Sequence, residues 1–439
     1  MRYNSLFLIT FLLLLNGCTP LRIQKEYKRL ECKAEQHVNL DLSFCQEQKT
    51  PVADPYSLTK KQAIAFALEY NKNLQAQLID LGIAKADLVR AGFFTNPHLE
   101  SVFKFPDSGN QANLEIVGTM KLSDFWQVPI RKNIAYDDLE IMTLSLIHTI
   151  LHITVETNYA YNDCLFQEAR LILITELYNK IKELRDRLIY RQKFGFQSYF
   201  DLHVANAMVG RWQAEVVNQQ MMLQNSYIHL RQLLGLPITE TFLNLSDTLI
   251  DSTYEIPSIT ALEEYGMQYR PELGIAFFNI EKAKDQLSLQ KAKIIDNVNA
   301  GFTYERDFER AKGWGPALSF DIPIFDTKYA QIAKAKQEVK KAKKVYLAQK
   351  QMRMEEIYHA FNLFQAKQQE VIIYQETILP AQQKAIDYAA KYLNRMQSNM
   401  KLLLEAEITF YEAQLAKLAK QFELSQAYVS VQKSIGKLL

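Results

Sequence analysis

The sequence is poor in the two residues that most often interrupt secondary structure. Glycine occurs 14 times and proline 12 times in 439 residues, well below average usages of about 7% and about 5%. So few interruptions favour a small number of very long elements. Because 48% of the residues are hydrophobic and 23% charged, intrinsic disorder is also excluded. We therefore expect a chain dominated by long helices.

Blocks of like charge are also lacking. Lys and Arg number 51 against 49 Asp and Glu, which gives a formal net charge of +2. Proteins that bind nucleic acid usually concentrate Lys and Arg on one surface, where they release counterions from the phosphate backbone. The sequence therefore predicts no nucleic-acid partner.

The common catalytic motifs are absent as well. The chain has no Gly-rich phosphate loop followed by Lys-Ser/Thr, no Gly-x-Ser-x-Gly and no His-Glu-x-x-His. His148 and His152 have metal-ligand spacing on one helix face, but no third ligand is evident, so polar packing is the preferred interpretation. We expect neither an enzyme nor a bound metal or cofactor.

A short hydrophobic run at the N-terminus is typical of an export signal. It covers Leu6 to Leu15, too short for a bilayer crossing of about 20 residues. It ends in Leu15-Asn16-Gly17-Cys18, which resembles a bacterial lipobox, so we expect residues 1–17 to be removed and the mature protein to begin at acylated Cys18. An ordinary signal peptide that happens to contain a cysteine is the alternative.

No second apolar run long enough for a transmembrane helix is evident downstream, so any further membrane crossing would have to use strands. The four cysteines do not suggest a nucleophile site. In an oxidising compartment Cys32 and Cys45 could form a disulfide in the N-terminal arm, residues 18–57. Cys164 lies in a helical pattern and is expected to be a small buried hydrophobe.

The two halves of the chain resemble each other, which predicts a tandem repeat. The similar segments occur in the same order with offsets near 200: Glu69-Tyr70-Asn71-Lys72-Asn73-Leu74 with Gln268-Tyr269-Arg270-Pro271-Glu272-Leu273, Val128-Pro129-Ile130 with Ile322-Pro323-Ile324, and Leu234-Gly235 with Ile435-Gly436. We place the repeats at residues 58–237 and 259–439, with a linker at 238–258.

Each repeat is expected to begin with a helix and continue with a β-hairpin. The helices run from Leu58 to about Phe93 and from Ile259 to about Ile295, and the hairpins cover about 98–122 and about 297–322, where side chains alternate with period two. We expect the hairpin turns at residues 106–110 and around Lys312-Gly313.

A very long helix and a return helix complete each repeat. The long helices are expected at about 130–194 and about 327–396, just after Pro129 and Pro323, with lengths on the order of 100 Å. Apolar residues spaced three and four apart predict a coiled-coil-like seam on the second: Ile332, Ala335, Val339, Ala342 and Tyr346. Pro380 predicts an interruption of the same helix.

Four strands cannot close into a barrel, and an open edge is not tolerated in lipid. Three copies would supply twelve strands, an even number within the range of outer-membrane barrels. Phe103, Phe105, Phe302 and Tyr304 would then face lipid. A small soluble sheet that caps a helical bundle is the alternative.

The combination resembles the TolC-like outer-membrane efflux protein family over roughly Leu58 to Leu439. The segments that carry the resemblance are Ala91-Gly92-Phe93-Phe94-Thr95-Asn96-Pro97, Leu318-Ser319-Phe320-Asp321-Ile322-Pro323-Ile324-Phe325-Asp326, Ile378-Leu379-Pro380-Ala381 and Arg191-Gln192-Lys193-Phe194-Gly195. The resemblance implies a mainly α fold with a small β part, and a homotrimer whose twelve-stranded β-barrel in the outer membrane continues into a periplasmic α-helical barrel.

By this resemblance we expect a lipid-anchored exit duct of a tripartite efflux system. It would passively conduct small molecules or metal ions from a periplasmic adaptor and an inner-membrane pump. A duct for type I protein secretion and a non-channel periplasmic coiled-coil scaffold lipoprotein are the alternatives.

The tips of the long helices are the expected adaptor-contact site. We assign to it Tyr190, Arg191 and Gly195 at the first tip and Gln397 and Ser398 at the second. A helix-terminating turn is the alternative role of Gly195. The second tip lacks a glycine like Gly195, and no counterpart of an acidic constriction ring is identified, so no gate residue is assigned.

Overall fold

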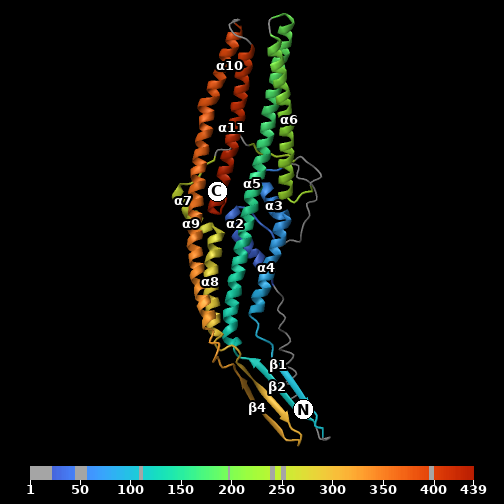
Figure 1. The fold of residues 1–439 in the computed structure, drawn as a ribbon, viewed down its shortest axis with the longest axis vertical. Coiled ribbons are helices and arrows are strands. Elements are labelled where there is room, and N and C mark those ends of the chain that lie inside the picture. The colour runs from blue at the N-terminus through green and yellow to red at the C-terminus, as the bar shows by residue number, and fades with distance from the viewer. Residues whose placement is uncertain are drawn as a thin grey trace. The chain divides into compact units, whose positions relative to one another are not determined.

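The computed structural model describes residues 22–44, 57–107, 112–195, 198–237, 243–248, 254–394 and 400–439 (Figure 1). Its contacts divide the chain into two compact units. The first unit comprises Met1–Leu30, Gln77–Leu146 and Glu272–Gln349, and the second comprises Glu31–Ala76, Ile147–Pro271 and Lys350–Leu439. Each unit therefore takes segments from both repeats.

The order of elements is the same in the two halves, which confirms a mainly α tandem repeat with a small β part. The first half contains α3 (Lys60–Tyr70), α4 (Lys72–Ala91), β1 (His98–Lys104), β2 (Asn113–Lys121), α5 (Asp124–Lys193) and α6 (Tyr199–Leu233). The second contains α7 (Ile259–Tyr269), α8 (Pro271–Ala292), β3 (Asn299–Arg306), β4 (Lys312–Ser319), α9 (Tyr329–Ile373), a π-helix (Tyr374–Ile378), α10 (Leu379–Asn394) and α11 (Met400–Ile435).

The single helix expected at the start of each repeat was wrong, because both are broken once. The breaks lie at Asn71 (φ −63°, ψ 115°) and at Arg270 (φ −72°, ψ 113°), whose backbones are extended. A residue before proline avoids the helical region, which accounts for Arg270 before Pro271. Asn71 caps α4 instead, since its Oδ1 accepts hydrogen bonds from the N–H groups of Asn73 at 3.0 Å and Leu74 at 3.1 Å.

In both repeats the residue at the helix break donates a hydrogen bond to a carbonyl at the end of the return helix. Asn71 Nδ2 donates to the carbonyl of Leu233 at 3.2 Å, and Arg270 Nε donates to the carbonyl of Ser434 at 2.6 Å. The glycine that follows each carbonyl by two residues has a positive φ, 69° at Gly235 and 73° at Gly436. The internal symmetry predicted from the sequence therefore extends to single hydrogen bonds.

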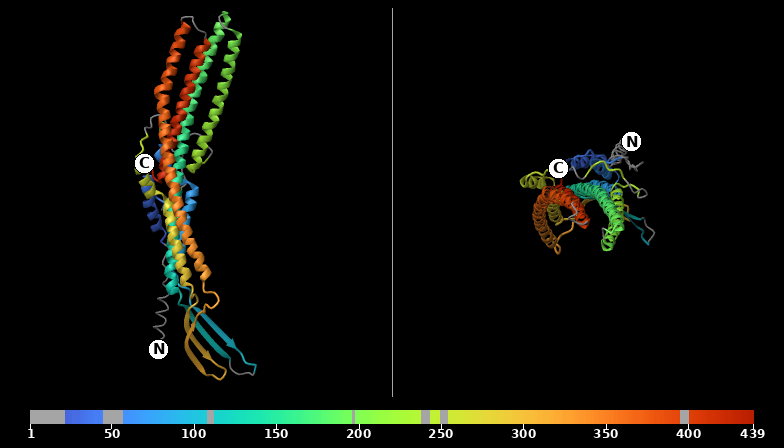
Figure 2. Two further views of the ribbon diagram at one scale, coloured as in Figure 1. Left: turned by 60° about the vertical axis from the view of Figure 1, so that its left-hand side comes forward. Right: turned by 90° about the horizontal axis from the view of Figure 1, so that it is seen from above.

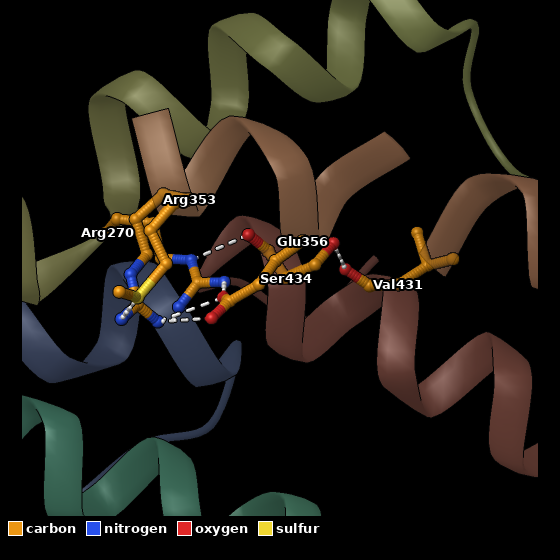
Figure 3. A network of polar contacts seen from close by, with 6 residues as sticks. Arg270, Arg353, Glu356, Val431 and Ser434 are labelled. Carbon is orange, nitrogen blue, oxygen red and sulfur yellow. Dashed lines mark hydrogen bonds and ion pairs between the residues drawn. The ribbon is translucent and has the colours of Figure 1, made fainter. Parts of the chain in front are cut away.

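The second repeat uses a charged side chain where the first uses a neutral amide. The Arg270 side chain is only 5% exposed and pairs with Glu356 at 2.5 Å (Figure 3). Glu356 also accepts from Arg353 Nη1 at 2.8 and 2.9 Å, while the Ser434 hydroxyl donates to the carbonyl of Val431. A buried guanidinium needs such a partner, because an uncompensated buried charge is strongly destabilising.

Helix α5 has 70 residues, which corresponds to a length on the order of 100 Å. It begins six residues earlier than expected and contains Pro129 within its first two turns, whereas α9 begins after Pro323. Among the described residues, α5 alone is long and apolar enough to cross a membrane by composition, which the sequence analysis overlooked. Half of that apolar stretch is buried inside the protein.

The second long helix is interrupted at Pro380, as predicted. The interruption is the π-helix Tyr374–Ile378, which ends two residues before the proline. Just before it, a closed set of ion pairs connects α9 to α11: Lys367 lies 3.0 Å from Glu370 and 2.9 Å from Glu423, and Lys420 lies 3.0 Å from both.

The N-terminal arm contains a helix that the sequence analysis did not predict, α2 (Gln24–Val38), with Leu30, Ala34 and Val38 buried. Cys32 lies exposed on α2, while Cys18 and Cys45 fall outside the described residues, so acylation and the disulfide stay predictions. Cys164 is fully buried, as expected, and burial raises the pKa of its thiol to about 12.

A buried carboxylate lies between α5 and α8 in the first unit. Asp137 is 7% exposed, and its Oδ2 has no hydrogen-bond partner within the described part of the chain. Burial, and then the nearby carboxylates of Asp285, Glu281 and Asp138, raise its pKa to about 6, although Lys282 opposes the shift. The folded state therefore holds a proton that the unfolded chain releases near its ordinary pKa of about 3.9.

This difference predicts that stability falls as the pH rises from about 4 to about 6. The stabilising contribution of the Asp137 proton is complete only below the pKa that Asp137 has in the unfolded chain, and it is lost above the folded pKa of about 6. Asp137→Asn removes this loss and should raise the free energy of unfolding at pH 7.5 by on the order of 1–2 kcal/mol. Thermal unfolding of the detergent-extracted protein across pH 4–8 measures the slope, with the exposed Asp87→Asn on α4 as the control. Equal slopes in wild type and Asp137→Asn would contradict the assignment.

The close contact between the end of the return helix and the helix break gives a second prediction. A Cβ at Gly436 would lie 2.8 Å from the carbonyl oxygen of Tyr269, at a positive φ that side chains rarely adopt. Gly436→Ala should therefore destabilise the protein by about 1–3 kcal/mol. The matched control is Gly210→Ala within α6, where an added Cβ would have no atom within 4 Å. This substitution should raise the free energy of unfolding by roughly 0.5–1 kcal/mol, because alanine favours a helix over glycine. Circular dichroism during heating measures both, and a tolerated Gly436→Ala would refute the strain argument.

Candidate functional site

The two hairpins of the first unit form one antiparallel sheet with strand order β1-β2-β3-β4 (Figures 1 and 2). The central pair joins the two repeats, from Leu114 opposite Arg306 to Lys121 opposite Asn299. The expected second turn at Lys312-Gly313 was wrong, since both residues belong to β4. The turn lies before them, where Asp307 N–H donates to the carbonyl of Ala311 at 3.1 Å.

One face of this sheet is apolar across all four strands. Directly opposed residues in antiparallel strands share a face. The register aligns the residues of this face in four rows, of which three are apolar apart from Ser101: Leu99, Gly118, Phe302 and Pro316; Ser101, Ile116, Tyr304 and Trp314; and Met120, Ala300 and Leu318. The fourth row, next to the turns, consists of Phe103, Leu114, Arg306 and Lys312 and so ends in two charged residues. Leu99 is 74% exposed, Trp314 76% and Leu318 66%. Phe302 and Trp314 stack at 5.8 Å between ring centroids. The exposed apolar area is thus continuous and built from both repeats.

The opposite face is polar. Its rows include Glu100, Val117, Thr303 and Gly315, and Val102, Glu115, Glu305 and Gly313. Asn113 Nδ2 donates to Glu305 at 3.2 Å on this face. The predicted amphipathic character of the hairpins is confirmed, and Phe103, Phe302 and Tyr304 occupy the apolar side by register, while Phe105 follows the end of β1.

Two features determine how the sheet can associate. Its outer strands, β1 and β4, have no strand partner on one side within the described residues, and open edges of this kind are templates for pairing with another chain. At the centre, a Cβ on Gly301 would lie 2.0 Å from the carbonyl oxygen of Gly118, so the absence of a side chain there permits the close approach of β2 and β3.

Polar contacts anchor the base of the sheet to the adjoining helices. Asp124 is 1% exposed and accepts hydrogen bonds from the backbone of Thr95 at 2.5 Å and from Arg131 at 3.1 Å. Burial alone would raise the pKa of Asp124, but the hydrogen bonds from Thr95 and the charge of Arg131 hold it below its usual value. Gln127 donates to Asp296 at 3.0 Å, which links α5 to the segment before β3.

The first helical tip belongs to the second unit and presents aromatic and charged groups. Tyr190 is 65% exposed and packs against Phe194 with ring centroids 5.0 Å apart. Gly195 closes α5 with a φ of 77°, and its N–H donates to the carbonyl of Gln192 at 2.9 Å. Ser198 then caps α6 by accepting from the Phe200 N–H. Gly195 thus has the helix-terminating geometry considered for it.

A shallow groove of about 480 Å³ runs along α5 beside this tip, lined by Glu183, Asp186, Arg187, Tyr190 and Arg191. The structure therefore brings Tyr190 and Arg191 into one groove and places Gly195 in the neighbouring turn, while Gln397 and Ser398 lie outside the described residues. Phe194, Tyr199 and Phe200 are also exposed beside this turn, and the sequence analysis did not assign them to the site. Their clustering around a glycine was the available signal.

The described part of the chain offers no group of three or more His, Cys, Asp or Glu that could hold a metal ion. His148 and His152 both lie on α5, and neither belongs to such a group.

Comparisons with known proteins agree with this architecture. The sequence model of the family described as outer membrane efflux protein matches residues 267–437. A search of curated proteins finds no match. Among solved structures, CusC is similar with a TM-score of 0.74 at 14% identity, covering 91% of this chain and 97% of CusC. VceC from Vibrio cholerae has a TM-score of 0.71 at 16% identity, covering 86% of this chain and 96% of VceC.

The outer membrane channel MtrE from Neisseria gonorrhoeae also has a TM-score of 0.71, at 15% identity, with 86% of this chain and 89% of MtrE covered. The resemblance predicted from the sequence is therefore confirmed: by sequence, most of the second repeat is similar to the outer membrane efflux protein family, and by fold, most of the chain is similar to CusC, VceC and MtrE.

Proposed function

We propose that the protein is the outer-membrane exit duct of a tripartite efflux system and works as a homotrimer. The observation that carries the proposal is the four-stranded sheet with one continuous apolar face, one polar face and two open edges. Such a sheet suits a surface whose apolar side contacts lipid and whose polar side faces water.

Three copies account for both open edges. If β4 of one protomer pairs with β1 of the next, the barrel has twelve strands and no remaining edge, as a lipid environment requires. Leu99, Phe302 and Trp314 then face lipid, while Glu100, Glu115 and Glu305 face the lumen. Cys18, if acylated, anchors the N-terminal arm in the same membrane.

The helical part is proposed to extend the duct through the periplasm and to meet an adaptor at the tips. Tyr190 and Arg191 support this role through the groove that they line, because exposed aromatic and arginine side chains are enriched at protein interfaces. Gly195 keeps the tip turn compact, and Gln397 and Ser398 are proposed to complete the site from the second tip. An inner-membrane pump, reached through the adaptor, supplies the energy.

The substrate is proposed to be a small molecule or a metal ion that diffuses through the lumen without chemical change. A duct for type I protein secretion and a periplasmic scaffold are the competing functions. A function as a periplasmic scaffold does not explain an exposed apolar face that is continuous across strands from both repeats. Cross-linking in native membranes distinguishes the three: a proton-driven exporter with its adaptor, an ATP-driven exporter, or no partner.

The sidedness of the sheet predicts opposite outcomes for two neighbouring substitutions on β3. Phe302→Lys places a charge on the apolar face and should cost about 2–4 kcal/mol if it lies near the bilayer midplane. Thr303→Lys, the matched control, places the same charge on the polar face and should be tolerated. The readout is the fraction of heat-modifiable, sodium dodecyl sulfate-resistant trimer in outer-membrane extracts. Equal trimer yields for both variants would refute the lipid-facing assignment.

If the tip contacts the adaptor, a substitution there should impair adaptor binding and leave trimer assembly intact. Gly195→Val forces a β-branched residue into a left-handed conformation at the end of α5, so adaptor recovery after cross-linking should fall at least about tenfold while the trimer persists. Gly210→Ala on the neighbouring α6 is the control and should leave both unchanged. Normal adaptor recovery with Gly195→Val would remove this turn from the contact site.

A further inference from the structure

The apolar face of the sheet ends in two cations beside the hairpin turns. Arg306 and Lys312 belong to its fourth row and are directly opposed on β3 and β4. Arg306 is the last residue of β3 and Lys312 the first of β4, so both lie at the end of the sheet opposite to the one that joins the helices of the first unit (Figure 1). The duct function assigns no role to this pair.

Neither cation is compensated within the part of the chain that the structure describes. Lys312 is exposed and Arg306 partly exposed, and neither side chain makes an ion pair or a hydrogen bond with a described residue. The adjacent carboxylate of Asp307 serves the turn instead, because its Oδ1 accepts the N–H groups of Glu309 at 2.8 Å and Ala311 at 2.9 Å. Like charges directly opposite each other in a sheet are destabilising. The pair therefore favours an anion.

The neighbouring row places the two cations at the border of the apolar surface. It contains Tyr304 opposite Trp314, and Trp314 is 76% exposed. Tyrosine and tryptophan are enriched where a membrane meets water, because their rings are apolar and one end of each is polar. Successive rows on one face are two residues apart, roughly 7 Å along a strand. Arg306 and Lys312 therefore lie one row further out, at the level expected for lipid headgroups.

We propose that Arg306 and Lys312 bind a phosphate monoester in the headgroup of a phosphorylated glycolipid. The proposal rests on the proposed function, because it requires the apolar face to contact lipid. A phosphate monoester carries a charge of about −1.5 to −2 at neutral pH and so matches two cations. The planar guanidinium of Arg306 binds two of its oxygens, and the Lys312 ammonium supplies a compact charge. Phe103 and Leu114, in the same row, contact the acyl chains.

The test uses the full-length protein, purified as a trimer in a neutral detergent, and native mass spectrometry with lipid A as the probe. Lipid A from which both phosphates have been removed is the matched probe. We expect intact lipid A to bind at least about tenfold more tightly, because only its phosphates form charge-assisted hydrogen bonds with the two cations. Equal affinities for the two lipids would overturn the inference.

Inorganic phosphate tests whether the site recognises a lipid or the anion alone. Millimolar phosphate should leave lipid A bound, because burial of the acyl chains adds affinity that the free ion lacks. Displacement at that concentration would overturn the assignment to a lipid. Heat-modifiable migration of the same preparation tests the duct separately. A trimer that does not distinguish the two lipids overturns the inference alone, whereas the absence of a trimer contradicts the proposed function and the inference with it.

Substitutions locate the site. Arg306→Gln and Lys312→Gln should each weaken the binding of lipid A at least about tenfold. Lys104→Gln is the matched control, because Lys104 is exposed at the same end of the sheet but its register places it on the polar face. Unaltered binding by both variants would place the lipid elsewhere and overturn the inference.

Thermal unfolding gives a second readout that loss of folding cannot imitate. Without lipid, Lys312→Gln should raise the unfolding temperature, because it removes a like charge directly opposite Arg306. Lipid A should raise the unfolding temperature of the wild type more than that of the variant, because a ligand stabilises the state that it binds. Equal shifts with lipid A would contradict the assignment of Lys312.

Discussion

The pairing of β2 with β3 is the contact on which the architecture of the first unit depends. Each hairpin alone would be a two-stranded ribbon, which is marginal in water. Their junction aligns eight residue pairs and makes a four-stranded sheet from two distant parts of the chain. The same register that gives the backbone its hydrogen bonds also assigns every side chain to a face, so the apolar side is continuous only because the repeats are joined here.

Duplication of one structural plan left different chemistry at equivalent positions. Asn71 and Arg270 both break a helix and both donate to a carbonyl at the end of a return helix. The amide needs only backbone partners, whereas the guanidinium also recruits Glu356 and, through it, Arg353 (Figure 3). The second repeat therefore depends on a charged network that the first does without, and single substitutions there should have larger consequences.

The spacing of apolar residues and the positions of proline and glycine predicted the hairpins, the long helices, the Pro380 interruption and the duplication. These features depend on short stretches of the sequence. What the sequence did not reveal depends on tertiary context. The break at Asn71 requires a side chain that caps the next helix, α2 gains its stability from buried Leu30 and Ala34, and Pro129 is tolerated inside α5. At the tip, the assignment of Tyr190 and Arg191 to the adaptor-contact site stays a prediction, and the groove that they share with Glu183 could not be predicted because it depends on the three-dimensional structure.

The π-helix at Tyr374–Ile378 has a geometric effect on everything beyond it. An α-helix rotates by about 100° per residue, and a π-turn accommodates roughly one residue more than an α-turn. Side chains of α10 are therefore out of phase with those of α9 by about the rotation of one residue. Apolar residues on both sides nevertheless belong to clusters with α11, Ile357 and Phe364 before the π-helix and Ala389 after it, so the extra residue shifts the positions at which apolar contacts recur without changing the helix that they meet. Helix α5 keeps one helical phase along its 70 residues.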